Sequence, residues 1–393
     1  MHVPLHDTSF LDWPFFDERH RQLARNLDHW CRSQLADLGH DDTDRICKTI
    51  VARLGTDGWL THSAPDPDDP KSRIDVRSLA IIRETLARHH GLADFAFAMQ
   101  GLGMGPVTLF GTPLQRRDWL TLTRAGKAIA AFALSEPASG SDVANMTTSA
   151  TRSGDSYIID GEKTWISNGG IANIYIVFAR TGGVPGSKGI SAFLVPSTTP
   201  GLTIAERIDV TAPHPLARLD FKNCRIPASA LIGAEGEGFR MAMATLDVFR
   251  PTVGAAALGF ARKALGLTLK RVQTRSLFGA PMTDLQMVQG HLADMALQID
   301  AAALLVYRAA WAKDQGADRI TREAAMAKLY ATEMAQDVVD RAVQLHGGDG
   351  VRAGSAVEDL YREVRALRIY EGASDVQKVV IARATLAGSR AAR

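Results

Sequence analysis

Cysteine is scarce in this chain, and no metal-binding motif compensates for it. The 393 residues include three cysteines, Cys31, Cys47 and Cys224, which lie far apart. A disulfide framework or a CxxC metal site needs closer or paired thiols, so neither is expected, and isolated thiols favour a reducing cytoplasm. His89 and His90 are adjacent and would point in different directions on a helix, and no HExxH pattern occurs. We therefore predict no metal site.

Long hydrophobic runs and a strong excess of charge are also missing. The apolar stretches are interrupted by charge before they reach the length of a membrane span. The opening, MHVPLHDTSF, lacks the basic and apolar regions of a signal peptide. Net charge is only +2, which gives no electrostatic reason to expect a nucleic-acid or membrane partner. The length predicts two or three domains, and 46% hydrophobic with 22% charged residues is typical of a globular protein.

The first third of the chain shows helical periodicity. Leu23, Leu27 and Trp30 recur at spacings of four and three, and comparable patterns continue to about residue 128. Gly101, Gly103 and Gly105 follow no strand, so a dinucleotide-binding fingerprint is not predicted there, and they permit close packing instead. We assign residues 1–129 to an N-terminal α-helical domain.

The texture changes near residue 130 to short segments rich in Ile, Val, Phe and Thr. Asp160-Gly161 separates two strand-like runs and predicts a β-hairpin turn. Helical texture returns near residue 238, where apolar residues from Leu285 to Ala309 alternate at spacings of three and four. The expected fold is therefore α+β, with a middle antiparallel β domain at residues 130–237 and a C-terminal α-helical bundle at residues 238–393.

Five stretches combine glycine with polar or aromatic residues: FALSEPASGSDVANMTT (132–148), GEKTWISNGG (161–170), RSLFGAPMTDLQ (275–286), VQLHGGDGV (343–351) and LRIYEGASDVQKVV (367–380). Each has an ordinary structural interpretation when it is taken alone: a surface loop, a core tryptophan, a helix–helix turn, a helix C-cap or a solvated glutamate. Each also suits a ligand, because such loops offer hydroxyl groups, N–H donors and close backbone approach.

Taken together and in this order, the five stretches resemble the acyl-CoA dehydrogenase family. The resemblance covers about residues 17 to 388 and does not include the first 16 residues. It implies the same three-domain fold, FAD as cofactor, an acyl-CoA substrate and electron transfer to an electron-transfer flavoprotein. It also implies an oligomer, usually a homotetramer built as a dimer of dimers.

The resemblance also implies which residues bind the cofactor. Phe132, Leu134 and Ser135 are expected to line the flavin ring, with Trp165 and Ser167 beside it. The residues that resemble contacts to the FAD of a neighbouring subunit are Arg275, Phe278, Leu285, Gln286, Gln344, Leu345, Gly347 and Gly348. Ala373 and Asp375 replace a hydroxyl residue and an amide, so only backbone contacts to FAD are expected at Ala373.

Glu371 matches the catalytic base of the family. A proton next to a thioester carbonyl is a weak acid, so a base must lie close to it, and donors must stabilise the enolate oxygen. The pKa of a glutamate in a water-poor site should rise toward the working pH. Some members carry the base one position before the arginine that here is Arg250, but Phe249 occupies that position. Substrate contacts are expected from Ser141, Asp247, Arg250, Tyr370 and Gly372.

Two other functions are compatible with this fold. Flavin oxidases and monooxygenases of the same superfamily react with oxygen, but the presence of Glu371 and the chain length favour a dehydrogenase. A nucleic-acid-protecting relative would need a basic face or extension, which the net charge and the short tail GSRAAR do not supply. No class of acyl group is predicted.

Overall fold

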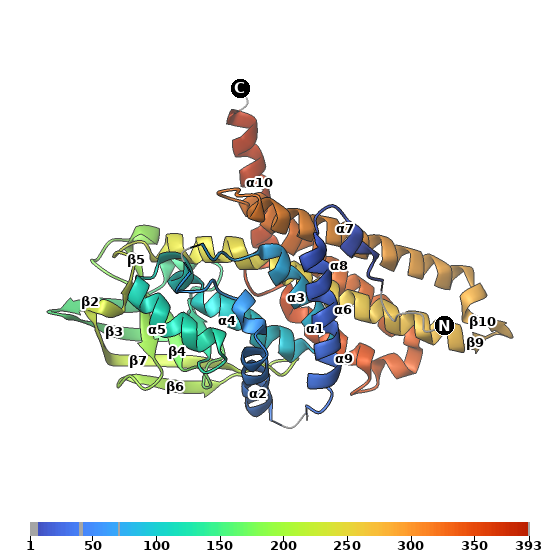
Figure 1. Cartoon of the computed structure of the whole chain (residues 1–393), viewed down its shortest axis with the longest axis horizontal. Coiled ribbons are helices and arrows are strands. Elements are labelled where there is room, and N and C mark those ends of the chain that lie inside the picture. Colours follow the sequence, from blue (N-terminus) through green and yellow to red (C-terminus); the bar gives the residue numbers. More distant parts are fainter. Residues whose placement is uncertain (1–6, 39–41, 70, 392–393) are drawn as a thin grey trace. The chain divides into compact units, whose positions relative to one another are not determined.

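The fold is described from a computed structural model, which describes residues 7–38, 42–69 and 71–391. The chain forms two compact units, one made of Met1–Ala36, Asp75–Asp94 and Arg250–Arg393 and the other of Asp37–Ile74 and Phe95–Phe249. The boundaries of these units differ from those of the three domains predicted from the sequence, residues 1–129, 130–237 and 238–393, and each unit contains parts of more than one predicted domain. The helical, β and helical order of elements along the chain is the one expected (Figure 1).

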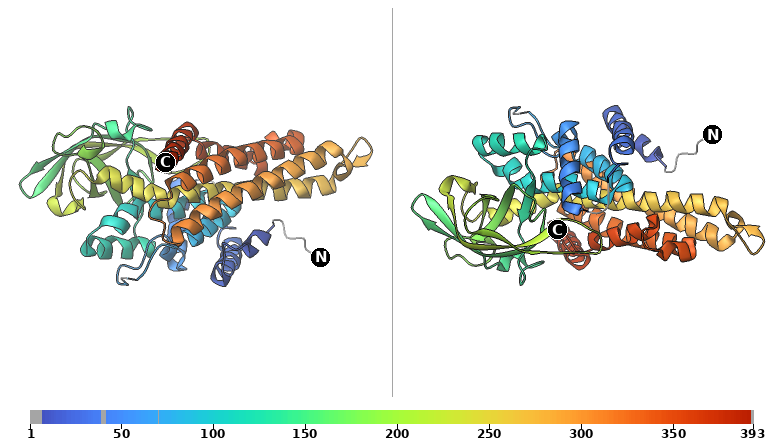
Figure 2. Two further views of the ribbon diagram at one scale, coloured as in Figure 1. Left: turned by 90° about the horizontal axis from the view of Figure 1, so that it is seen from above. Right: turned by 90° about the horizontal axis from the view of Figure 1, so that it is seen from below.

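The first unit is helical. Its elements are η1 (Ser9–Asp12), α1 (Glu18–Gln34), α3 (Val76–His89), most of α6 (Gly238–Thr274), β9 (Ser276–Leu277), β10 (Ala280–Pro281), η6 (Met282–Asp284), α7 (Gln286–Asp314), α8 (Thr321–His346), η7 (Gly347–Val351), α9 (Ala356–Leu367) and α10 (Ser374–Ala391). Helices α7 and α8 run side by side, as Figures 1 and 2 show. The predicted apolar stripe of α7 is confirmed, because Val288, Met295, Ile299, Ala302 and Val306 are buried.

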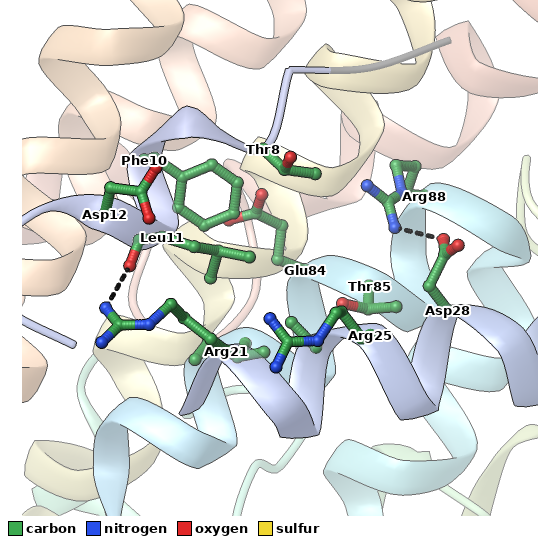
Figure 3. Close-up of a pocket in the computed structure, with 12 residues that line it drawn as sticks. Thr8, Phe10, Leu11, Asp12, Arg21, Arg25, Asp28, Glu84, Thr85 and Arg88 are labelled. Atoms are coloured by element: carbon green, nitrogen blue, oxygen red, sulfur yellow. Dashed lines mark hydrogen bonds and ion pairs between the residues drawn. The ribbon is translucent and has the colours of Figure 1, made fainter. Parts of the chain in front are cut away.

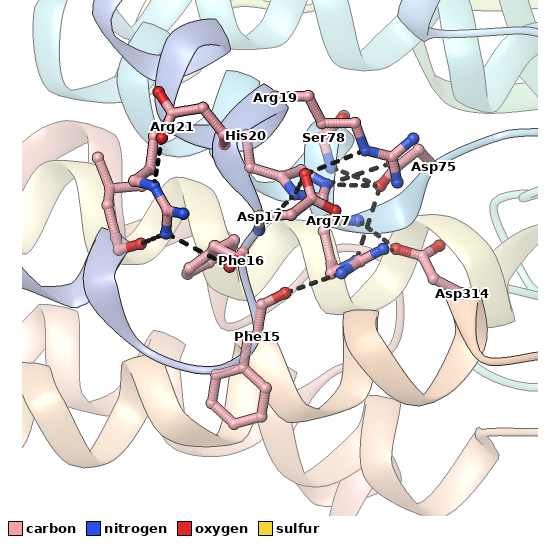
Figure 4. Close-up of polar contacts among 12 residues, drawn as sticks. Phe15, Phe16, Asp17, Arg19, His20, Arg21, Asp75, Arg77, Ser78 and Asp314 are labelled. Atoms are coloured by element: carbon pink, nitrogen blue, oxygen red, sulfur yellow. Dashed lines mark hydrogen bonds and ion pairs between the residues drawn. The ribbon is translucent and has the colours of Figure 1, made fainter.

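Helix α3 lies inside this unit, with its residues 76–87 all buried. Asp314 caps its N-terminus, since the carboxylate accepts the backbone N–H of Val76 at 2.8 Å and of Arg77 at 3.1 Å. The Arg77 side chain donates to the same carboxylate at 2.8 Å and to the Phe15 carbonyl at 2.9 Å (Figure 4). A carboxylate at a helix N-terminus satisfies otherwise unpaired donors and favours the helix dipole.

The segment before α1, which the resemblance did not cover, packs on the bundle. Phe10 stacks on Tyr307 with ring centroids 5.5 Å apart, and the guanidinium of Arg262 lies 4.3 Å from the centre of the Phe10 ring. A cavity of about 220 Å³ lies beneath this segment, and Arg88 on its wall pairs with Asp28 (Figure 3). No predicted site residue lines this cavity.

The second unit contains the sheet. Its elements are α2 (Thr43–Thr56), η2 (Trp59–His62), α4 (Gly91–Phe110, from Phe95 onward), α5 (Pro113–Arg124), β1 (Ala130–Ala133), η3 (Val143–Asn145), β2 (Ser149–Ser153), β3 (Ser156–Ser167), β4 (Ile174–Arg180), η4 (Gly186–Gly189), β5 (Ile190–Pro196), β6 (Leu202–Arg207), β7 (Leu216–Pro227), η5 (Ala228–Ala230), β8 (Leu231–Ile232) and the first part of α6. The strand order is β6-β7-β3-β2-β4-β5-β8, with β1 paired to β4. Most pairs are antiparallel, as expected, but β1 and β2 each pair in parallel with β4.

The predicted hairpin turn at Asp160-Gly161 is wrong. Both residues lie within the single strand β3, and the hairpin instead joins Ser153 to Ser156. Gly161 has φ +141° at a shift in the pairing of β3 with β7, where a Cβ atom would come within 2.7 Å of Thr148. The glycine therefore serves an irregular position within the strand, where a side chain does not fit.

The three glycines of α4 serve close packing. A Cβ atom on Gly101 would lie 2.5 Å from the Phe249 ring, one on Gly103 2.7 Å from Ala130, and one on Gly105 2.3 Å from Thr245. Phe249, which occupies the alternative position of the base, is therefore a buried packing residue. Within the described ranges, no helix is both long and apolar enough to cross a membrane.

Candidate active site

Glu371 lies in a strained turn between α9 and α10. Its φ is +51°, and that of the following Gly372 is +93°. The left-handed region is unfavourable for a residue with a side chain, so neighbouring groups must hold Glu371 there. Glycine meets the same demand at position 372 without a steric cost.

Three buried side chains hold the two carbonyl groups of this turn. Arg250 of α6 donates Nε–H to the Glu371 carbonyl at 3.1 Å. Lys328 of α8 donates from Nζ to the Gly372 carbonyl at 2.9 Å, and Gln377 of α10 donates from Nε2 to the same oxygen at 3.0 Å. Lys328 and Gln377 are fully buried and Arg250 is nearly so. Side chains from three helices, α6, α8 and α10, therefore fix the backbone carbonyl groups of Glu371 and Gly372.

Both positively and negatively charged side chains surround the Glu371 carboxylate. Its Oε2 atom is shielded from solvent and has no hydrogen-bond partner among the described residues. Burial raises the pKa of Glu371, while the positive charges of Arg83, Arg250 and Lys328 oppose the rise and Asp94 adds to it. The pKa is raised overall, which is the direction that a general base at neutral pH requires.

Arg83 and Asp94 form a buried ion pair beside this carboxylate. The guanidinium donates from Nε and Nη2 to the two carboxylate oxygens of Asp94, both at 2.8 Å, and from Nη1 to Thr252 Oγ1 at 3.1 Å. The bidentate geometry fixes the guanidinium plane. Burial also lowers the pKa of Lys328 to about 8, against the opposing charge of Glu371.

A second group of predicted residues gathers at the far end of the bundle, where α6 turns into α7 and α8 ends. Leu285 and Leu345 pack against a small core of Val272, Met282 and Val288. The turn between β9 and β10 places Phe278 at φ +53° with 98% of its surface exposed. The other predicted residues of this end, Arg275, Gln286, Gln344, Gly347 and Gly348, are also exposed.

The second unit brings together the residues predicted to face the flavin ring. Phe132 lies on β1, Leu134 and Ser135 follow that strand, and the Ser135 carbonyl accepts the backbone N–H of Thr164 at 3.0 Å. Trp165 next to it has φ +59° and is 58% exposed, whereas most tryptophans are largely buried. An exposed indole in a strained position has the form of a ring-stacking surface.

A buried ion pair supports this part of the second unit. Lys163 Nζ donates to Glu136 Oε1 at 2.8 Å and to the Leu134 carbonyl at 3.1 Å. Glu136 also accepts the N–H groups of Thr147 and Thr148, at 2.6 and 3.0 Å. Although burial opposes it, the charge of Lys163 lowers the pKa of Glu136 to about 2. The pair holds the loop after β1 in one shape.

The remaining predicted residues lie in different surroundings. Ser141 is exposed on the loop of the second unit, and Asp247 is buried on α6. Tyr370 lies next to Glu371, and Asp375 is exposed and pairs with Lys378 at 3.2 Å. Among the described residues, no cluster of three or more His, Cys, Asp or Glu is arranged to hold a metal ion.

The sequence alone does not indicate several side chains that support these sites: Arg83, Asp94, Lys328, Gln377 and the pair of Glu136 with Lys163. One signal was present: Lys328 lies on a helix stripe with Ala324, Ala327 and Ala331, which are all buried. A lysine at a core position of a helix indicates a buried partner. The partner itself is 44 residues away and cannot be identified from spacing.

Comparisons with known proteins agree over most of the chain. Family models described as acyl-CoA dehydrogenase N-terminal, middle and C-terminal domain match residues 17–127, 131–224 and 236–386. The short-chain specific acyl-CoA dehydrogenase of Homo sapiens mitochondria is 40% identical over 372 residues, covering 93% of this chain and 89% of that protein.

Solved structures give the same picture. Butyryl-CoA dehydrogenase from Megasphaera elsdenii matches with a TM-score of 0.87 and 32% identity, covering 94% of this chain and 99% of that one. A chain from structural work on the electron transferring flavoprotein of Acidaminococcus fermentans matches with a TM-score of 0.86 and 32% identity, covering 94% and 98%.

Proposed function

Because this chain belongs to the acyl-CoA dehydrogenase family, a family of oxidoreductases, we propose that it dehydrogenates an acyl-CoA thioester between C2 and C3. The product is the trans-2-enoyl thioester. The observation that carries the proposal is the arrangement at Glu371: a carboxylate with a raised pKa, an orphaned Oε2 atom and a backbone fixed by three helices.

Glu371 is the base that removes a proton from C2 of the substrate. Its orphaned oxygen has no competing donor among the described residues, so it is available to accept that proton. Among the described residues, no backbone carbonyl accepts the Glu371 N–H, which leaves this donor for the thioester carbonyl, where enolate charge develops. The positive charges of Arg83, Arg250 and Lys328 favour the ionised, reactive form of the base.

The residues fit FAD as the cofactor. The exposed indole of Trp165 and the hydroxyl-bearing Ser135 and Ser167 suit the flat, polar-edged flavin ring. The exposed Phe278 and Arg275 suit the FAD bound by a neighbouring subunit. When bound, FAD supplies the acceptor for the hydride that leaves C3. The Glu136–Lys163 pair keeps the loop of Ser135 in shape for this binding.

The substrate and partners are proposed from the relatives. Similarity to a short-chain specific and a butyryl-CoA dehydrogenase supports a short acyl group. Electron-transfer flavoprotein is the proposed electron acceptor, which the matching chain from the Acidaminococcus fermentans work supports. The exposed Phe278, Arg275 and Gln286 support an oligomer in which another copy covers this end of the bundle, such as the expected homotetramer. The proposed location is the cytoplasm.

The test is anaerobic addition of butyryl-CoA to the FAD-loaded protein, followed by visible absorption. Wild type should lose its flavin band, and Glu371→Gln should retain FAD and bind the thioester while flavin reduction slows by roughly a hundredfold to ten-thousandfold. Unchanged reduction in Glu371→Gln would refute the base. A wild-type flavin that no straight, branched or aryl thioester reduces would refute the activity.

A further inference from the structure

The Gly372 carbonyl, one residue after Glu371, accepts two hydrogen bonds from side chains that have no surface exposure. Lys328 Nζ lies 2.9 Å from this oxygen and Gln377 Nε2 lies 3.0 Å from it. The two donors come from different helices, α8 and α10. Burying a lysine in a helical core is unfavourable unless its ammonium group donates hydrogen bonds to a buried acceptor. The partner here is the turn that carries the base.

We propose that Lys328 and Gln377 are positioning residues that hold the Gly372 carbonyl and thereby aim the Glu371 carboxylate at C2 of the thioester. The inference rests on the proposed dehydrogenation. Neither residue touches the reacting atoms through this bond, because both bind the backbone and not the Glu371 carboxylate. Their effect is on where the carboxylate lies.

The strain of the turn explains why such a clamp is needed. Glu371 at φ +51° and Gly372 at φ +93° form two successive left-handed residues, the first of which has a side chain. Without restraint, Glu371 would relax toward the common backbone regions, and the carboxylate would turn with the backbone. A Cβ atom on Gly372 would lie 2.2 Å from Gln377 Nε2, so the glycine and the amide are fitted to each other.

The two donors differ in charge, which separates their roles. Lys328 acts on Glu371 together with the cations Arg83 from α3 and Arg250 from α6, whereas the anion Asp94 from α4 opposes them. Glu333 and Arg368 also act on the charge of Lys328. Gln377 is neutral. Loss of either donor loosens the turn, but only loss of Lys328 also removes a positive charge that favours the ionised base.

The experiment compares Lys328→Met, Gln377→Leu and the control Arg322→Met, which removes an exposed cation from the same helix α8. Two readouts are used on the FAD-loaded proteins. The first is the rate of anaerobic flavin reduction by butyryl-CoA over a range of pH. The second is exchange of the C2 protons of acetyl-CoA for deuterium in D₂O, which needs the base alone, because acetyl-CoA has no C3 and cannot be dehydrogenated.

Both core variants should lose roughly 10- to 100-fold in both rates, because a displacement of about 1 Å has effects of that size. The dissociation constant of butyryl-CoA should stay within about threefold of wild type, since the loss lies in the reacting geometry. Lys328→Met should also move the acid limb of the reduction profile to higher pH, whereas Gln377→Leu should leave that limb in place. Arg322→Met should match wild type.

Wild-type rates in both core variants would overturn the proposal. So would a loss of rate that is matched by an equal loss of butyryl-CoA affinity, because that pattern reports a damaged binding site. Flavin content and the thermal midpoint identify any variant that fails to fold, and Gln377→Leu, which leaves all charges in place, then decides the matter. Reduction of the wild type in the same experiment tests the proposed function separately from the clamp.

Discussion

The buried pair of Arg83 and Asp94 gives a sharp test of the electrostatics around Glu371. The two side chains are 3% and 5% exposed and share two hydrogen bonds of 2.8 Å. Arg83→Met leaves the Asp94 carboxylate buried without its guanidinium partner, which typically costs about 3 to 5 kcal/mol. For a cooperative unit of about 200 residues this corresponds to a fall in thermal midpoint on the order of 10 °C.

The double variant Arg83→Met with Asp94→Leu should recover most of this loss. Apolar residues of similar volume often replace a buried ion pair with little net change in stability, because both desolvation costs disappear. The assay is thermal unfolding of each variant at pH 7 with FAD in excess, arranged as a double-mutant cycle. A small effect of Arg83→Met, or a double variant that loses the sum of the single losses, would refute the reasoning.

The same two single substitutions should also shift the pKa of Glu371 in opposite directions. Arg83 is the strongest of the influences that lower the pKa of Glu371, and Asp94 raises it. Arg83→Met should therefore raise this pKa further and move the acid limb of flavin reduction to higher pH. Asp94→Leu should move the limb to lower pH. If the pH profiles of both variants coincide with that of the wild type, the charges of Arg83 and Asp94 do not influence the pKa of Glu371.

Three further changes test other parts of the structure. Glu136→Gln should lower the free energy of unfolding at pH 7 by roughly 3 kcal/mol, because the pKa of Glu136 is about 2 in the folded protein and 4.5 ordinarily. Urea unfolding at several pH values measures this difference between wild type and variant. The difference should be complete above about pH 4.5 and vanish as the pH falls toward 2. Phe278→Ala should weaken FAD retention in gel filtration without lowering the thermal midpoint of the FAD-saturated protein, since the ring is exposed. Gly161→Ala should destabilise by roughly 1 to 3 kcal/mol in urea unfolding, because its Cβ would strike Thr148. Gly154→Ala serves as the control: Gly154 also has a positive φ, but its Cβ would meet open space, so this variant reports backbone strain without the clash.

Local patterns in the sequence were sufficient for the helices and for the order of elements. The stripes of α7 and α8 appear directly as spacings of three and four, because each helix buries one face. The turn signal at Asp160-Gly161 misled, because the same two residues also suit an irregular position inside a strand. The Asp160 carboxylate accepts the backbone N–H of Asn223 on β7, a partner 63 residues away that no local pattern contains.

The motif was sufficient to propose Glu371 as the base, but the surroundings that raise its pKa could not be predicted from the sequence. Its pKa depends on burial and on Arg83, Asp94, Arg250 and Lys328, which come from four helices spread over 245 residues of the chain. Each of these charges taken alone resembles a surface residue, and only tertiary packing brings them to one carboxylate. A single substitution among them therefore changes both stability and the protonation of the base. The effects on protonation differ in sign, whereas loss of either member of a buried ion pair lowers stability. The pH profiles therefore distinguish an electrostatic role from a packing role where stability alone does not.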